Sequence, residues 1–164
     1  MLSCACKLLL HAIYLQYLDM NKIEHIGIAV KDLKVAANIY QLLLNTTVYK
    51  TEDVPSEGVK TAFLQIGPNK IELLESSNAE SPIAKFIEKK GEGIHHIAFD
   101  VKDIAAEMAR LRAEGFVLLN EQPQLGADNK LVCFVHPKTA NGVLIELCQE
   151  VGDQIPHWEA ETLL

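Results

Sequence analysis

The sequence predicts an α+β fold in which two tandem βαβββ modules form one curved mixed sheet. The first observation is a repeat: an eleven-residue segment around His25 recurs around His96, 71 positions later and without a gap. The second is the end of each copy, where a single acid, Glu72 or Glu146, interrupts an apolar run. A sequence unit that occurs twice usually folds as two copies of one structural module.

The first module begins with a strand that leads into a helix. Asp32 is a good N-cap, because its side chain can accept a hydrogen bond from the first helical turn. Apolar residues then follow at helical spacing: Leu33, Ala36, Ala37, Tyr40, Leu43 and Leu44. We expect three short strands after this helix, at residues 47–54, 59–66 and 70–75.

A linker with one helix joins the modules, since Ser81 is a good N-cap, Pro82 suits the first helical position and Gly91 suits the end. In the second module Asp103 caps a helix that ends at Gly115. Three strands are expected to follow it, at 116–120, 131–136 and 143–149. The predicted division is therefore a first module at 20–76, a helical linker at 77–93 and a second module at 94–150.

The chain ends lie outside both copies. Residues 1–19 form a poor secretory signal, because His11 interrupts the apolar run and no small-residue cleavage site follows. The run is also shorter than the ~20 apolar residues that a transmembrane helix needs. We expect Met20 to be the natural start and residues 1–19 to be an extension that is not native; the alternative is a tail that packs as a short helix. Residues 151–164 are expected to form a C-terminal tail.

Composition excludes some classes of function. Hydrophobic residues make up 49% of the 164 residues, which is ample for a core, and the net charge is −7. Because no basic stripe is present, we expect no nucleic-acid partner, and we expect no membrane partner either. The four cysteines show no metal-type spacing, so they indicate reduced thiols of an intracellular, cytoplasmic protein. They are Cys4, Cys6, Cys133 and Cys148.

A metal site is predicted where the two modules meet. Because side chains alternate along a strand, His25 shares its face with the small residues Gly27 and Ala29, and His96 sits in a similar setting. A carboxylate buried in an apolar strand costs several kcal/mol unless it is paired or bound to metal. We therefore expect His25, Glu72, His96 and Glu146 to bind a divalent ion at the pseudo-twofold axis.

The alternative for each of these residues is structural. A single strand histidine is more often a packing residue than a ligand, and a single strand glutamate usually faces solvent. Two matched His–Glu pairs at equivalent positions favour the metal site. Strict alternation puts His95 on the face opposite His96, so its expected role is packing or a hydrogen bond behind a ligand.

These motifs resemble the vicinal oxygen chelate (glyoxalase) superfamily and, within it, the methylmalonyl-CoA epimerases. The segments that carry the resemblance are EHIGIAV at 24–30, SPIAKF at 81–86, GIHHIAF at 93–99, HPK at 136–138 and GVLIEL at 142–147. Together they extend over nearly all of residues 20–150. The GxHH strand and the HPK…GVLxEL ending are the most discriminating.

The resemblance implies an isomerase that interconverts (R)- and (S)-methylmalonyl-CoA by removing the α-proton through an enolate. It implies a divalent ion, most often Co²⁺, with Mn²⁺ or Ni²⁺ as alternatives, an acyl-CoA substrate and a homodimer. In a eukaryote it implies the mitochondrial matrix. Glu72 and Glu146 would be the catalytic residues, one carboxylate for each face of the substrate.

The chain departs from some family members at Thr61, where they carry a further glutamate. Threonine is not a competent base at neutral pH, and Glu57 nearby is expected to be a solvated turn residue. The nearest alternative function is a glyoxalase I type lactoylglutathione lyase with the same metal set. A non-enzymatic small-molecule-binding member is a further alternative.

Overall fold

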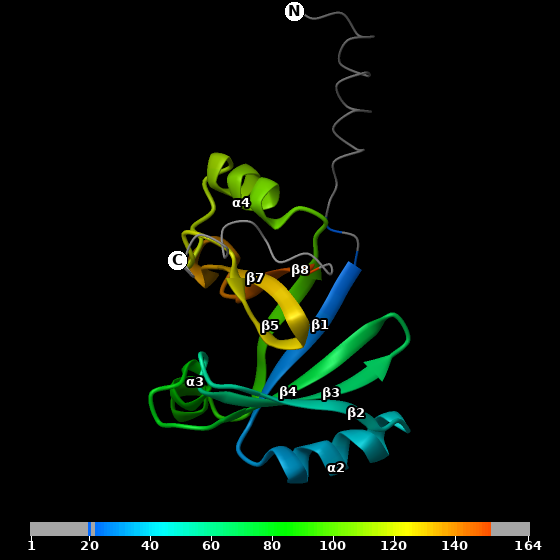
Figure 1. Cartoon of the computed structure of the whole chain (residues 1–164). Helices are drawn as coiled ribbons and strands as arrows, with labels where there is room; N and C mark the ends of the chain where they lie inside the picture. The colour runs from blue at the N-terminus through cyan, green and yellow to red at the C-terminus, as the bar shows by residue number, and fades with distance from the viewer. Residues whose placement is uncertain (1–19, 21, 152–164) are drawn as a thin grey trace, which may run out of the picture.

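Two antiparallel strands, β1 (Lys22–Val30) and β5 (Gly93–Asp100), form the centre of an eight-stranded mixed sheet (Figure 1). The strand order is β2-β3-β4-β1-β5-β8-β7-β6. Strand β4 (Asn69–Ser76) pairs with β1 in parallel, and β8 (Ile145–Glu150) pairs with β5 in the same way. This computed structural model describes residue 20 and residues 22–151.

Each half of the sheet has the predicted order of elements. The first half also contains α2 (Leu33–Leu44), β2 (Val48–Val54) and β3 (Val59–Ile66). The second half contains α4 (Ile104–Ala113), β6 (Gln124–Leu125), β7 (Lys130–Val135) and two short 3-10 helices, η1 (Ala127–Asn129) and η2 (Pro137–Thr139). Between the halves lies α3 (Pro82–Lys90). The predicted curved α+β sheet is confirmed.

The predicted helix caps are present. Asp32 accepts a hydrogen bond from the backbone N–H of Val35 at 2.9 Å, and Asp103 accepts one from Ala106 at 2.9 Å. Ser81 caps α3 in the same way, with Pro82 in its first turn. Equivalent aspartates therefore begin equivalent helices in the two halves.

One expected strand is wrong. Residues 116–120 do not form a ladder; Leu118 makes a single isolated bridge with Val135. Pairing does not continue beyond this bridge, because the backbone N–H of Phe134 donates its hydrogen bond to the side-chain oxygen of Asn120, at 3.0 Å, rather than to a backbone carbonyl. The chain pairs with β7 again only at β6, which the sequence pattern does not predict.

Each half has its own apolar core. Under α2, side chains of β1, β3 and β4 such as Ile28, Leu64 and Leu73 pack together, and under α4 a second cluster includes Met108 and Leu147. The helices α2 and α4 therefore cover one face of the sheet in each half, as the branched side chains predict. On the opposite face, Ile83 of α3 packs against Ala29 and Leu74, and a cavity opens beside this cluster.

The expectations for residues 1–19 and for the tail beyond residue 151 lie outside the described residues, as do Cys4 and Cys6. Cys133 and Cys148 are buried free thiols. Within the described part of the chain, no helix has both the length and the apolar character needed to cross a membrane.

Candidate metal centre

The strand register places the four expected ligands in two rows across the centre of the sheet. In one row Gly27 of β1 lies between Glu72 of β4 and His96 of β5. In the other row Ala98 of β5 lies between His25 of β1 and Glu146 of β8. Each row therefore has a small residue at its centre with a histidine on one side and a glutamate on the other.

Gly27 is the residue that makes room for His96. A Cβ at position 27 would lie 2.2 Å from Cε1 of the His96 imidazole, closer than real side chains approach. The sequence prediction that small residues surround the histidines is therefore confirmed at this position.

The four side chains direct their polar atoms at one point. His25 Nε2 lies 2.9 Å from His96 Nε2, 3.3 Å from Glu72 Oε2 and 3.6 Å from Glu146 Oε2. His96 Nε2 lies 3.0 Å from Glu146 Oε2 and 3.6 Å from Glu72 Oε2. The structure thus brings together all four residues named from the repeat.

Burial and mutual contacts perturb all four groups. Burial alone would raise the pKa of Glu146 and Glu72, but hydrogen bonds and charges of the two histidines lower both. Burial alone would lower the pKa of His25 and His96, but the carboxylates raise both. Two buried carboxylates that contact the same two histidines require compensating positive charge, from imidazolium or from a cation.

The donor set fits a divalent ion. Donors that neighbour each other around one ion, with bonds of about 2.0–2.2 Å, lie about 3 to 3.4 Å apart. The separations from each histidine Nε2 to the other histidine and to the two glutamates are 2.9 to 3.6 Å. The donor atoms of His25, His96 and Glu146 all lie within 4.8 Å of one another, and Glu72 joins them through its contacts with the two histidines. Two imidazole nitrogens with two carboxylate oxygens suit first-row divalent ions.

A cavity of about 270 Å³ opens onto these atoms. Its wall includes all four side chains and is otherwise largely apolar, with Val54, Val59, Leu74, Ile83, Phe63 and Phe134 among the residues that line it. A concave, mostly apolar pocket with a few converging polar groups is the usual form of a small-molecule site.

Two β-bulges place further side chains at the site. The β1–β5 register skips Glu24 on β1 and His95 on β5, which are the residues directly before the two histidines. A bulge of this kind re-aims a side chain out of strict alternation. The expectation that His95 lies on the face opposite His96 is therefore wrong: it lines the same cavity, and its Nδ1 lies 2.9 Å from His96 Nδ1.

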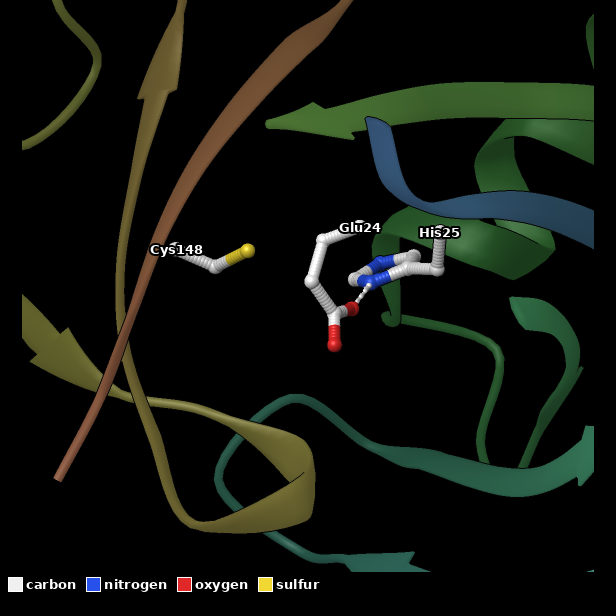
Figure 2. Close-up of side chains that lie close together, drawn as sticks. All are labelled: Glu24, His25 and Cys148. Atoms are coloured by element: carbon white, nitrogen blue, oxygen red, sulfur yellow. Dashed lines mark hydrogen bonds and ion pairs between the residues drawn. The ribbon is translucent and has the colours of Figure 1, made fainter. Parts of the chain in front are cut away.

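Sequence reasoning missed Glu24. Its Oε2 accepts a hydrogen bond from His25 Nδ1 at 2.6 Å, and Figure 2 shows the carboxylate beside the ring. The repeat does point to this position, because both copies carry a polar residue directly before the histidine, Glu24 in one and His95 in the other. Strict strand alternation, however, places these two side chains on the face opposite the histidines.

Glu24, His25 and Cys148 form a second group with donor atoms within 4.8 Å of one another (Figure 2). This group is a poorer cation site. Both oxygens of Glu24 are already paired, with His25 and with Lys70. Burial, followed by the charge of Glu146, raises the pKa of the Cys148 thiol to about 12, which disfavours the thiolate that binds metals.

Thr61 and Glu57 both line the cavity. Thr61 is buried, and its hydroxyl donates to the backbone carbonyl of Glu52 at 3.5 Å. Glu57 lies in the turn before β3 and is half-buried rather than fully solvated.

Comparisons with known proteins agree with this fold and site. Residues 24–134 match the family model of the Glyoxalase/Bleomycin resistance protein/Dioxygenase superfamily. The ethylmalonyl-CoA/methylmalonyl-CoA epimerase of Cereibacter sphaeroides is 43% identical over 132 residues, which cover 79% of this chain and 98% of that protein. The mitochondrial methylmalonyl-CoA epimerase of Homo sapiens is 39% identical over 132 residues, 80% of this chain and 75% of that protein.

Among solved structures, a variant of Streptomyces coelicolor methylmalonyl-CoA epimerase in complex with 2-nitronate-propionyl-CoA superposes with a TM-score of 0.78. It is 35% identical, and the match covers 81% of this chain and 99% of that one. The chain belongs to the Glyoxalase/Bleomycin resistance protein/Dioxygenase superfamily and, within it, to the methylmalonyl-CoA epimerase family.

Proposed function

We propose that the protein is an isomerase that interconverts (R)- and (S)-methylmalonyl-CoA. The observation that carries the proposal is the convergence of His25, Glu72, His96 and Glu146 beside an apolar cavity. The similarity to epimerases over four-fifths of the chain favours this reaction over the glutathione-dependent one. An intact set of four donors also argues against a non-enzymatic binding role.

Each side chain has a role in this proposal. His25 and His96 hold a divalent ion together with Glu72 and Glu146, and we propose Co²⁺, with Mn²⁺ or Ni²⁺ as alternatives. The bound ion would supply Lewis-acid stabilisation of the negative charge that develops when the α-proton leaves. The apolar wall around these residues excludes water, which strengthens electrostatic interactions inside the cavity.

The two glutamates are the proposed proton carriers. Epimerisation requires the proton to leave one face of the α-carbon and to return to the other. Glu72 and Glu146 belong to β4 and β8, which flank the central strand pair on opposite sides. Each carboxylate is therefore proposed to exchange a proton with one face of the substrate. Thr61, buried and without an acidic group, has no part in proton transfer.

Assembly and location complete the proposal. We propose a homodimer in the cytoplasm, or in the mitochondrial matrix of a eukaryote. The mitochondrial name of the Homo sapiens relative supports the second location.

The test is proton exchange at the α-carbon of methylmalonyl-CoA in deuterated water, with and without added Co²⁺. Metal-dependent deuterium incorporation and racemisation are expected. The methylglyoxal–glutathione adduct serves as the second substrate, and it is not expected to be turned over at a comparable rate. Preference for that adduct would refute the proposed epimerase activity. Turnover of neither substrate would favour a non-enzymatic role in binding a small molecule.

A further inference from the structure

We propose that Glu24 is a positioning residue, which fixes the orientation of the His25 ring so that its Nε2 faces the metal centre. The inference rests on the proposed metal site. Glu24 contacts Nδ1 of His25, the ring nitrogen that points away from His96, Glu72 and Glu146.

The backbone itself turns Glu24 toward His25. The extra residue that the first bulge inserts into β1 is Glu24, because Ile23 pairs with Phe99 and His25 with the adjacent Ala98. Without the bulge, neighbouring residues of a strand would face opposite sides of the sheet. With it, the carboxylate lies 2.6 Å from Nδ1 of the next residue and is only 2% exposed.

The contact determines which ring nitrogen carries the proton. An ionised carboxylate can only accept hydrogen bonds, so Nδ1 of His25 must donate. The other nitrogen, Nε2, then presents a lone pair to the centre when the ring is neutral. A carboxylate behind a ligating histidine is a common way to fix its tautomer and ring orientation.

Cations from both modules hold Glu24 in place. Its second oxygen, Oε1, lies 2.5 Å from Lys70 Nζ of β4 and 3.5 Å from Lys130 Nζ of β7. Lys70 in turn contacts Asp128 of η1 at 2.7 Å. Because these groups come from different elements, the carboxylate cannot rotate away from His25 without breaking ion pairs on both sides.

The second module has a different group at the equivalent position. There His95, the residue that the second bulge inserts, contacts Nδ1 of His96. Burial, followed by the charge of His96, lowers the pKa of His95 to about 4, so the group behind His96 is an imidazole without the negative charge that Glu24 carries. The two ligating histidines are therefore supported unequally, by a carboxylate in one module and by an imidazole in the other.

The experiment measures the Co²⁺ affinity of the purified full chain by competition with a chelator. Loss of a residue that supports a ligand typically weakens metal affinity about 10- to 100-fold, and Glu24→Ala is expected to reach the upper end. Glu24→Gln keeps the size of the side chain and an acceptor oxygen but not the charge, so a loss of about tenfold is expected. This second variant keeps the test valid if the loss of the ion pairs with Lys70 and Lys130 prevents Glu24→Ala from folding.

The control is Glu107→Gln, which removes the charge of another buried carboxylate, one that pairs with Arg110 on α4. It should leave Co²⁺ affinity unchanged even if it lowers the melting temperature of the metal-free protein. Wild-type affinity in Glu24→Ala, or in Glu24→Gln if Glu24→Ala does not fold, would overturn the inference. Absence of Co²⁺ binding by the wild-type chain would instead overturn the proposed function.

Discussion

Replacing Gly27 by alanine tests how closely the sheet fits the metal centre. The added methyl group would lie 2.2 Å from His96 Cε1, whereas ordinary contacts begin at 3.4 Å, so the ring must move by about 1.2 Å. Ligand bonds tolerate only about 0.2 Å, and a misplacement of about 1 Å in a reactive site costs about 100-fold. We expect Gly27→Ala to weaken Co²⁺ binding and to lower turnover by about 100-fold or more.

The same substitution should lower the free energy of unfolding of the metal-free protein by about 1–3 kcal/mol, as inserted atoms in packed interiors do. Alanine is otherwise favoured over glycine in a strand by roughly 0.5–1 kcal/mol. In a His96→Ala background, where the clash is absent, Gly27→Ala should therefore be neutral or stabilising. Urea unfolding of the four proteins of this cycle measures the difference. Unchanged stability and Co²⁺ affinity in Gly27→Ala alone would refute the reasoning.

Glu146→Ala is expected to lose turnover and Co²⁺ binding together, measured by racemisation and chelator competition; retained turnover would remove it from the mechanism. Thr61→Ala should keep racemisation within a small factor, because its hydroxyl has no acid–base role, and a large loss would assign it one. Burial alone would raise the pKa of Glu24, but its contacts with His25 and Lys70 lower it from 4.5 to about 2. A lowered pKa in the folded state means that the carboxylate stabilises the fold above about pH 4.5 and that this contribution is lost as pH falls toward 2. Metal-free wild type should therefore lose more stability than Glu24→Gln across that range in denaturant titrations, and equal losses would contradict the assignment.

Most of the fold could be predicted because the repeat carries strong local signals. The aspartates at 32 and 103 begin helices in both copies, and the glutamates at 72 and 146 mark equivalent strands. Alternation assigned the helix-covered face correctly. It failed at residues 116–120, where the side chain of Asn120 replaces a backbone partner on the sheet edge. This side-chain hydrogen bond depends on a contact between distant parts of the chain, so the periodicity of the sequence does not reveal it.

The candidate site shows the same division. The convergence of the four residues could be predicted from the repeat and from the alternation of side chains along a strand, because the folded strands keep this alternation at His25, Glu72, His96 and Glu146. Glu24 and His95 do not, because each occupies a bulge that reverses the direction of its side chain. A bulge changes the register by one residue, and period-two reasoning has no means of locating it.

The seam between β1 and β5 joins two halves that have separate apolar cores. Each half supplies one histidine and one glutamate, so a bound ion would add a further link between the halves, beside the β1–β5 hydrogen bonds and the ion pairs of Glu24 and Asp128 with lysines of the opposite half. Removal of the ion should then reduce the cooperativity of unfolding more than it disturbs either half. Amide hydrogen exchange should accelerate first along β1 and β5, while amides beneath α2 and α4 keep their protection.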